Sequence, residues 1–171
     1  MPIKNIYIKG TDLITDNEII TTAKIKDYPS FFKCSNYTLS NRIKKIPLVK
    51  DVKIKKNIFG KLTIYVSEYK ILFYNLESQK LVLENNKSIE NNDNYKGVPT
   101  LINYVPDKIY KRLTKSLLKV DSDILALISE IEYSPTKNND EVIDDTRFIL
   151  RMNDGNTVYA NLLNIKNLNH Y

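Results

Sequence analysis

The fold of the first part of this chain is decided by residues 46–68, which read IPLVKDVKIKKNIFGKLTIYVSE. Apolar residues alternate with lysines over residues 52–55, and with polar residues or tyrosine over residues 62–66. This alternation is the period of a half-buried strand. The segment between the two strands contains asparagine and glycine, which are turn-forming residues. The stretch therefore predicts two antiparallel strands joined by a short turn.

The residues before this hairpin predict one strand followed by two short helices. Residues 3–9 alternate as a strand does. Residues 15–18 read Thr-Asp-Asn-Glu, a capping-box pattern that starts a helix. Ser35 or Asn36 is expected to cap a second helix over residues 37–45, because proline follows shortly after it. The predicted order over the first 69 residues is β-α-α-β-β.

The connection between the two predicted helices contains a proline and two aromatic residues, Phe31 and Phe32. We expect both aromatic side chains to fill the core of this first unit. Cys34 is the single cysteine, so an intrachain disulfide is excluded. A small packing residue is the expected role of this thiol.

Residues 70–171 predict a second unit, a mixed α/β domain with a mostly antiparallel sheet, so the fold class of the whole chain is α+β. Asp154 and Gly155 form a strong hairpin turn, since these residues tolerate positive φ. Residues 85–96 and the acidic residues 138–145 are expected to be loops. The expected strands and helices are strands 71–75, 80–84, 129–133, 148–152 and 157–162, a short extended piece at 97–102, and helices 110–119 and 122–127.

Positive charge is concentrated in the first part of the chain. Residues 1–70 contain 14 Lys+Arg and 6 Asp+Glu, a net charge of +8, and the remaining residues contain 12 and 14, a net charge of −2, which together give +6. A basic part of this kind is able to face an anionic membrane or polymer. Lysines on ordinary solvated faces explain the same bias, and both interpretations stay open at this stage.

The sequence offers little material for catalysis, so we predict no enzyme, no cofactor and no metal site. His170 is the only histidine and lies next to the end of the chain, where a preorganised site is uncommon. Nucleotide-binding glycine motifs and Cys/His metal spacings are missing from the sequence. Lysines of the hairpin at 46–68 favour nucleic acid weakly, because arginine is scarce and the alternation explains these lysines as solvent-facing.

Strand edges are the interaction feature that the sequence predicts, because an edge strand is a template for a partner's strand. The opposite interpretation is that lysines at such edges prevent pairing. The main candidate edge is Thr157, Val158, Tyr159, Ala160, Asn161 and Leu162, and the second is Val52, Lys53, Ile54 and Lys55.

Several segments, in their order and spacing, resemble the FtsQ/DivIB family of bacterial cell-division proteins. The similarity includes the β-α-α-β-β order, which is that of a POTRA domain, and extends over nearly the whole chain. The segments that carry the resemblance are residues 6–10, 15–20, 46–56, 62–68, 97–101, 128–131 and 154–158.

The resemblance implies a role for the chain as well as a fold. It implies the extracytoplasmic part of a single-pass membrane protein at the division septum, acting as a non-enzymatic scaffold of the divisome. Partners of the FtsL and FtsB/DivIC type are expected on the second domain, with no nucleic acid and no small-molecule substrate. The alternative is a POTRA-type polypeptide-binding module of a transport or secretion complex.

One departure from the family concerns the end of the second domain. In the family a further strand follows the last helix and forms much of the partner-binding edge. This sequence ends at residues 168–171, in or just before that helix. The second domain, residues 70–171, is therefore expected to be truncated, with the strand at 157–162 as its exposed edge.

Overall fold

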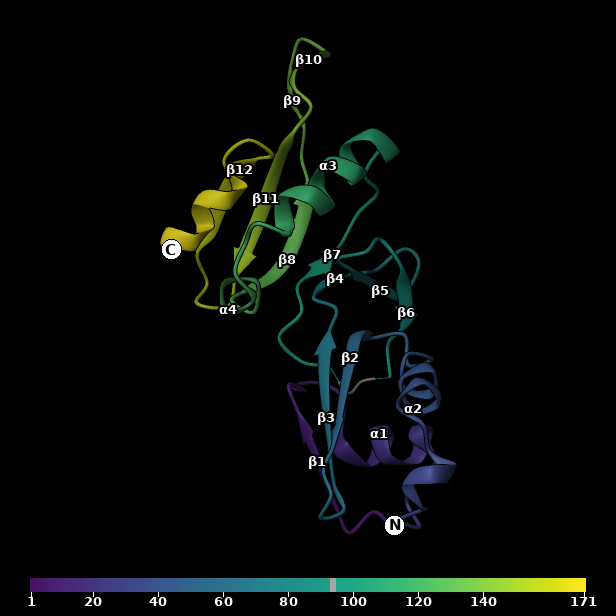
Figure 1. Cartoon of the computed structure of the whole chain (residues 1–171). Helices are drawn as coiled ribbons and strands as arrows, with labels where there is room; N and C mark the ends of the chain where they lie inside the picture. Colours follow the sequence, from purple (N-terminus) through teal and green to yellow (C-terminus); the bar gives the residue numbers. More distant parts are fainter. Residues whose placement is uncertain (93–94) are drawn as a thin grey trace. The chain divides into compact units, whose positions relative to one another are not determined.

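A computed structural model describes residues 1–92 and 95–171. The chain divides into two compact units, Met1–Tyr69 and Lys70–Tyr171 (Figure 1). We call them unit 1 and unit 2. In the loop expected at residues 85–96, residues 93–94 lie outside the described part of the chain.

Unit 1 is a three-stranded mixed sheet with two helices. The sheet order is β1-β3-β2, with β1 parallel to β3 and β2 antiparallel to β3. The predicted β-α-α-β-β order is confirmed, with one 3₁₀ turn between the helices. Its elements are β1 (Asn5–Lys9), α1 (Asp16–Ala23), η1 (Phe31–Lys33), α2 (Asn36–Ile43), β2 (Val49–Lys56) and β3 (Lys61–Glu68).

Both helices of unit 1 begin at the kind of residue that the sequence predicts. The Thr15 hydroxyl accepts a hydrogen bond from the Glu18 amide at 3.2 Å and so caps α1. The Ser35 hydroxyl accepts from the Thr38 amide at 3.1 Å, which makes Ser35 the cap of α2. Asn36, the other candidate, is the first residue of the helix.

The expectation that both aromatic residues of the helix connection fill the core is wrong. Phe32 is 89% exposed, and Phe31 is only partly buried. Ser30 caps the short turn η1 by accepting from the Phe32 amide at 3.3 Å, within the turn that leaves the Phe32 ring in solvent. Aliphatic side chains of the helices and strands, and Cys34 at 3% exposure, fill the core instead.

Unit 2 is built on a seven-stranded mixed sheet of order β12-β11-β8-β7-β4-β5-β6. Four of its six strand pairs are antiparallel, and the pairs β4–β7 and β7–β8 are parallel. The predicted fold class is confirmed. The elements are β4 (Ile71–Asn75), β5 (Lys80–Leu83), β6 (Ser88–Glu90), β7 (Thr100–Leu101), α3 (Asp107–Leu117), α4 (Ser122–Leu125), β8 (Ile128–Tyr133), β9 (Thr136–Asn138), β10 (Glu141–Asp144), β11 (Arg147–Met152), β12 (Thr157–Asn161) and η2 (Ile165–His170).

Two segments that the sequence predicts as loops contain strands. β6 adds to the edge of the sheet beside β5, within the polar segment expected to be irregular. The acidic segment forms the separate hairpin β9–β10, in which Asn139 and Asp140 turn the chain at φ 49° and 68°. Asparagine and aspartate tolerate this left-handed conformation, so the polar residues of this segment form the turn of a hairpin rather than an irregular loop.

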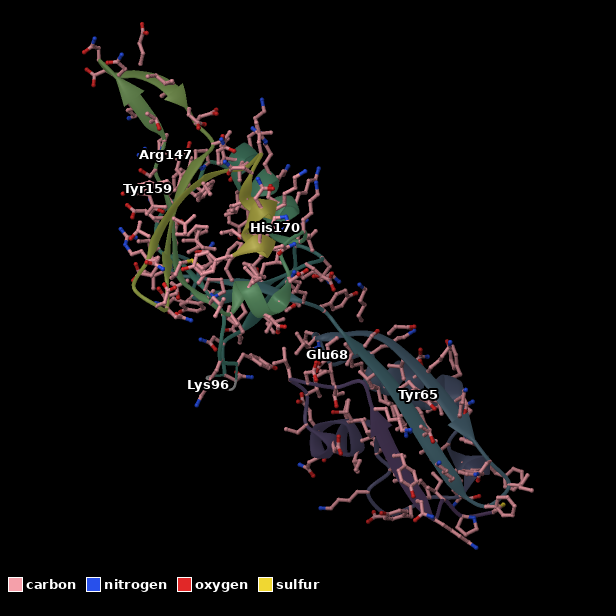
Figure 2. The ribbon with its side chains drawn as sticks, turned by 90° about the vertical axis from the view of Figure 1, so that its left-hand side faces the viewer. Tyr65, Glu68, Lys96, Arg147, Tyr159 and His170 are labelled. Atoms are coloured by element: carbon pink, nitrogen blue, oxygen red, sulfur yellow. The ribbon has the colours of Figure 1, made fainter. Side chains whose placement is uncertain are left out.

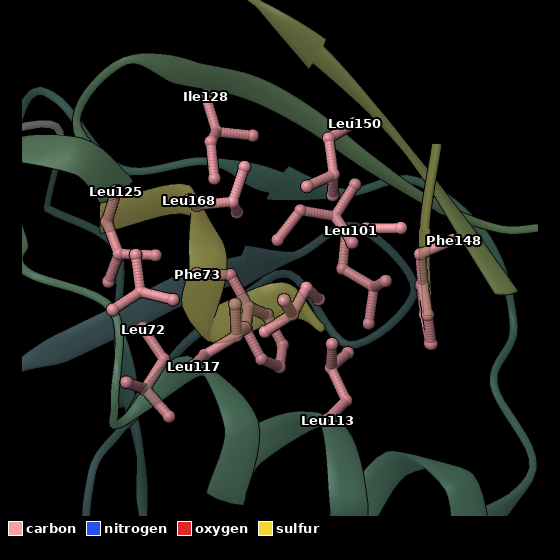
Figure 3. Close-up of a cluster of buried hydrophobic side chains, with 14 of the residues drawn as sticks. Leu72, Phe73, Leu101, Leu113, Leu117, Leu125, Ile128, Phe148, Leu150 and Leu168 are labelled. Atoms are coloured by element: carbon pink, nitrogen blue, oxygen red, sulfur yellow. The ribbon is translucent and has the colours of Figure 1, made fainter. Parts of the chain in front are cut away.

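The core of unit 2 lies between one face of the sheet and α3, α4 and η2 (Figure 3). Leu113 and Leu117 of α3 are completely buried, as are Phe73, Phe148 and Leu150 of the sheet. Along β11 and β12, buried residues alternate with residues whose side chains lie on the opposite face of the sheet. Among the described residues, no helix is long and apolar enough to cross a membrane.

A candidate docking edge on unit 2

β12 is the last strand of the seven-stranded sheet, with β11 on one side and no strand on the other among the described residues. The strand includes the candidate residues Thr157 to Asn161. Leu162 lies just beyond it, is 7% exposed and belongs to the core. Ala160 is also buried, so its side chain is directed inward rather than toward a partner. The structure thus places most of the candidate residues at an edge.

The hydrogen-bond phase of β11 and β12 shows which main-chain groups point outward. Met152 donates to the Asn156 carbonyl at 2.8 Å, and Leu162 donates to the Thr146 carbonyl at 3.2 Å. Both pairs fit the register in which Leu150 faces Val158. Hydrogen-bonded and non-bonded pairs alternate in an antiparallel ladder. The main-chain N–H and C=O of residues 157, 159 and 161 therefore point away from β11.

The outward main-chain N–H and C=O of Asn161 are already hydrogen-bonded to Asn164. The Asn164 side-chain oxygen accepts from the Asn161 amide at 2.9 Å, and the Asn164 amide donates to the Asn161 carbonyl at 3.1 Å. The open part of the edge is consequently Thr157 and Tyr159. It is shorter than the six-residue edge that the sequence predicts.

Tyr159 is the prominent side chain of this edge. It is 65% exposed, and the Arg147 guanidinium lies 5.8 Å from its ring centre (Figure 2). Arg147 is held in place by Ser134, to whose carbonyl and hydroxyl oxygens it donates at 2.9 and 3.1 Å. The exposed ring therefore rests on a positioned cation, a favourable arrangement for a contact surface.

Charged side chains of β11 and β8 lie on the same face of the sheet, further from the β12 edge. The Arg151 guanidinium lies 2.7 Å from a Glu132 carboxylate oxygen and 3.4 Å from one of Glu130. The Glu132 carboxylate beside this guanidinium raises the pKa of Arg151 above its ordinary value. One guanidinium thus faces two carboxylates, so this group of three side chains has a net charge of −1.

An open groove of about 310 Å³ borders β12 on the side of η2. His170, which lies next to the end of the chain, lines this groove on η2 (Figure 2). Tyr171 lines it as well, and its hydroxyl donates to an Asp154 carboxylate oxygen at 2.6 Å. This bond ties the last residue to the β11–β12 turn and fixes one end of the groove.

The second candidate edge, on β2, is less accessible. β2 is an edge strand of unit 1 and carries Val52, Lys53, Ile54 and Lys55. The outward carbonyl of Ile54 accepts from the Asn36 side chain of α2 at 3.4 Å. Val52 is buried, and the Lys55 ammonium lies 5.6 Å from the centre of the Tyr65 ring. α2 therefore covers part of this edge.

A family model described as "POTRA domain, FtsQ-type" matches residues 1–69, which is the whole of unit 1. Proteins named "Cell division protein DivIB" match across both units. The one from Enterococcus faecalis (strain 62) is 29% identical over 172 residues, covering 94% of this chain. The one from Bacillus subtilis (strain 168) is 29% identical over 165 residues, also covering 94% of it.

The chain belongs to the FtsQ/DivIB family.

Its POTRA domain is unit 1, as the resemblance implied. The chain spans 43% of the Enterococcus faecalis relative and 60% of the Bacillus subtilis relative. A solved structure, titled as the major extracytoplasmic domain of the trans isomer of DivIB from Geobacillus stearothermophilus, is 26% identical with a TM-score of 0.48. It covers 61% of this chain and 89% of that one.

Proposed function

We propose that this FtsQ/DivIB chain is a non-enzymatic scaffold of bacterial cell division, the extracytoplasmic part of a membrane protein at the division septum. Relatives named as cell-division proteins over nine-tenths of the chain support the division role. Its partners are extracytoplasmic segments of the FtsL and FtsB/DivIC type. They dock on unit 2, while the POTRA domain is a separate module.

The observation that carries the docking proposal is the open edge at Thr157 and Tyr159. Outward N–H and C=O groups of this kind are what an added strand requires, and main-chain hydrogen bonds supply affinity in this mode of recognition. The groove beside η2 supplies room for a partner's side chains, lined by both apolar and polar residues. A partner's extended segment pairs with β12 and places alternate side chains in that groove.

The decisive variant is Tyr159→Pro, because proline removes the outward N–H without breaking a bond to β11. Edge strands tolerate proline at outward positions. Ser88→Pro on β6, at the opposite edge of the same sheet, is the matched control. Leu83 donates to the Lys87 carbonyl at 2.8 Å, which places Ser88 in the outward phase as well.

The measurement is the affinity of each variant for a DivIC-like ectodomain by biolayer interferometry. Tyr159→Pro should weaken binding about tenfold or more, the loss expected for a main-chain hydrogen bond and its neighbours. Ser88→Pro should bind as the parent does. Equal affinity of the Tyr159→Pro variant and the parent chain would show that the partner does not pair with β12.

A further inference from the structure

Three segments of unit 1 meet at one end of its sheet and together form a surface that we call the basic aromatic tip: residues 1–4, 26–33 and 56–61. Phe31 donates to the Met1 carbonyl at 3.0 Å, and Lys4 donates to the Gly60 carbonyl at 2.8 Å. Pro2 and Ser30 form an isolated bridge. Figure 1 shows the start of the chain and the β2–β3 turn at this same end of the unit.

Large apolar side chains project from the tip into solvent. Phe32 is 89% exposed, Ile58 77% and Phe59 73%. Tyr28 is 50% exposed and belongs to the same surface. Single exposed apolar residues are ordinary on proteins, but a group of them on adjoining turns marks an interaction site.

Positive charge surrounds these side chains. The three segments contain one acidic residue, Asp27, and five lysines, which are Lys4, Lys26, Lys33, Lys56 and Lys61. All of these lysines except Lys56 are exposed. The tip therefore has the charge that attracts an anionic surface, together with apolar groups able to leave water.

Lys56 holds the tip in shape rather than extending from it. Its ammonium donates to the Cys34 carbonyl and, at 3.5 Å, to the Phe31 carbonyl, and lies 5.1 Å from the Phe31 ring centre. On the β2–β3 turn, the Asn57 side-chain oxygen accepts from the Phe59 and Lys61 amides at 3.0 and 2.9 Å. Both turns are therefore preorganised, which lowers the entropy that binding costs.

We propose that the basic aromatic tip docks on the surface of a lipid bilayer that carries anionic phospholipids. Phe32, Ile58 and Phe59 enter the boundary between headgroups and acyl chains, and the exposed lysines contact headgroup phosphates. A bilayer fits better than a protein partner, because these highly exposed apolar residues lie on turns that also carry exposed lysines. A soluble polyanion would use the lysines and leave the rings in water.

This inference does not depend on docking at β12, since it concerns only the residues of unit 1. The first test is co-sedimentation of the full chain with vesicles of phosphatidylglycerol and phosphatidylcholine, compared with vesicles of phosphatidylcholine alone. We expect binding to the anionic vesicles only, weakening as salt is raised. The double variant Phe32→Ser/Phe59→Ser should lose about tenfold in partitioning, because two apolar side chains no longer leave water.

The matched control is Tyr104→Ser/Leu163→Ser, which removes two exposed apolar residues of unit 2, at 63% and 75% exposure. It should bind vesicles as the parent does. Equal losses in the two double variants would overturn the assignment to the tip, as would the absence of binding to anionic vesicles at low salt.

A second readout uses the fact that the chain contains no tryptophan. Phe59→Trp places a single fluorophore on the tip, and Leu163→Trp places one on unit 2. Anionic vesicles should shift the emission of Phe59→Trp to shorter wavelength, and brominated lipids should quench it, with no change for Leu163→Trp. Binding without a shift at residue 59 would mean that the rings stay in water, and the proposed insertion would be wrong.

Discussion

Glu68, at the end of β3, holds the loop between β1 and α1 by a set of hydrogen bonds that its replacement should release (Figure 2). Its two carboxylate oxygens accept from three successive amides. Asp12 donates at 2.7 Å, Leu13 at 3.1 and 3.0 Å, and Ile14 at 2.7 Å. The loop ends at the Thr15 cap, so this one side chain connects the last strand of the POTRA domain to the start of its first helix.

The substitution Glu68→Gln keeps the shape of the side chain but leaves one acceptor oxygen in place of two. The amide group also turns N–H donors toward a main-chain donor. A hydrogen bond to a charged group contributes about 1.5–3 kcal/mol, and the lower end applies because most of these bonds are exposed. We therefore expect Glu68→Gln to lower the free energy of local loop opening by about 1–2 kcal/mol.

Amide hydrogen exchange measures this opening directly. About 1.4 kcal/mol corresponds to a tenfold change in an equilibrium, so Leu13 and Ile14 should exchange about tenfold faster in the variant. Glu77→Gln, which removes the same charge from an exposed turn of unit 2, should leave these amides unchanged. Unchanged exchange protection of the Leu13 and Ile14 amides in Glu68→Gln would refute the conclusion that Glu68 holds this loop.

Three further predictions concern backbone conformation, core packing and pH. Gly10→Ala should lower the free energy of unfolding of unit 1 by more than about 3 kcal/mol, because the new Cβ would lie 2.3 Å from a main-chain oxygen of β3. Gly155 has a similar φ of 89°, but a Cβ there would meet open space. Gly155→Ala should therefore cost unit 2 only about 1 kcal/mol, measured by chemical denaturation. Leu113→Ala empties a fully buried site in α3 and should cost unit 2 about 2–5 kcal/mol in the same assay. The hydrogen bond from the Tyr171 hydroxyl holds the pKa of Asp154 below its ordinary value. The ionised carboxylate therefore stabilises the turn at pH values above that ordinary pKa, and this stabilisation is lost as the pH falls through the lowered pKa. Tyr171→Phe should raise the pKa of Asp154 in an NMR titration.

Segments with strong local signals were predictable because the same short-range chemistry operates in the folded chain. The caps of α1 and α2 follow from hydroxyl side chains that reach amides three residues away. The Asp154-Gly155 turn follows from the φ of 89° that glycine adopts without strain. Alternation in β2 and β3 was equally informative, since one face of each strand is buried.

Segments whose structure depends on distant neighbours were missed. β6 is three residues long and exists because β5 offers it an edge, while the polar composition of the segment suggested a loop. Hydrophobicity alone predicts Phe32 in the core, but whether a side chain is buried depends on the direction in which its turn presents it. No local signal predicts that Glu68 holds the loop between β1 and α1, because its hydrogen-bond partners lie more than 50 residues earlier.

The docking edge shows the same division. The sequence by itself determined that a second hairpin strand starts at Thr157, because alternation and a turn dipeptide act over a few residues; the strand covers residues 157–161, one residue fewer than predicted. Only the tertiary structure decided that this strand ends the sheet, that its odd-numbered residues point outward, and that Asn164 closes one end. Strand order and hydrogen-bond phase are properties of how separate segments pair, and no periodicity within one segment encodes them.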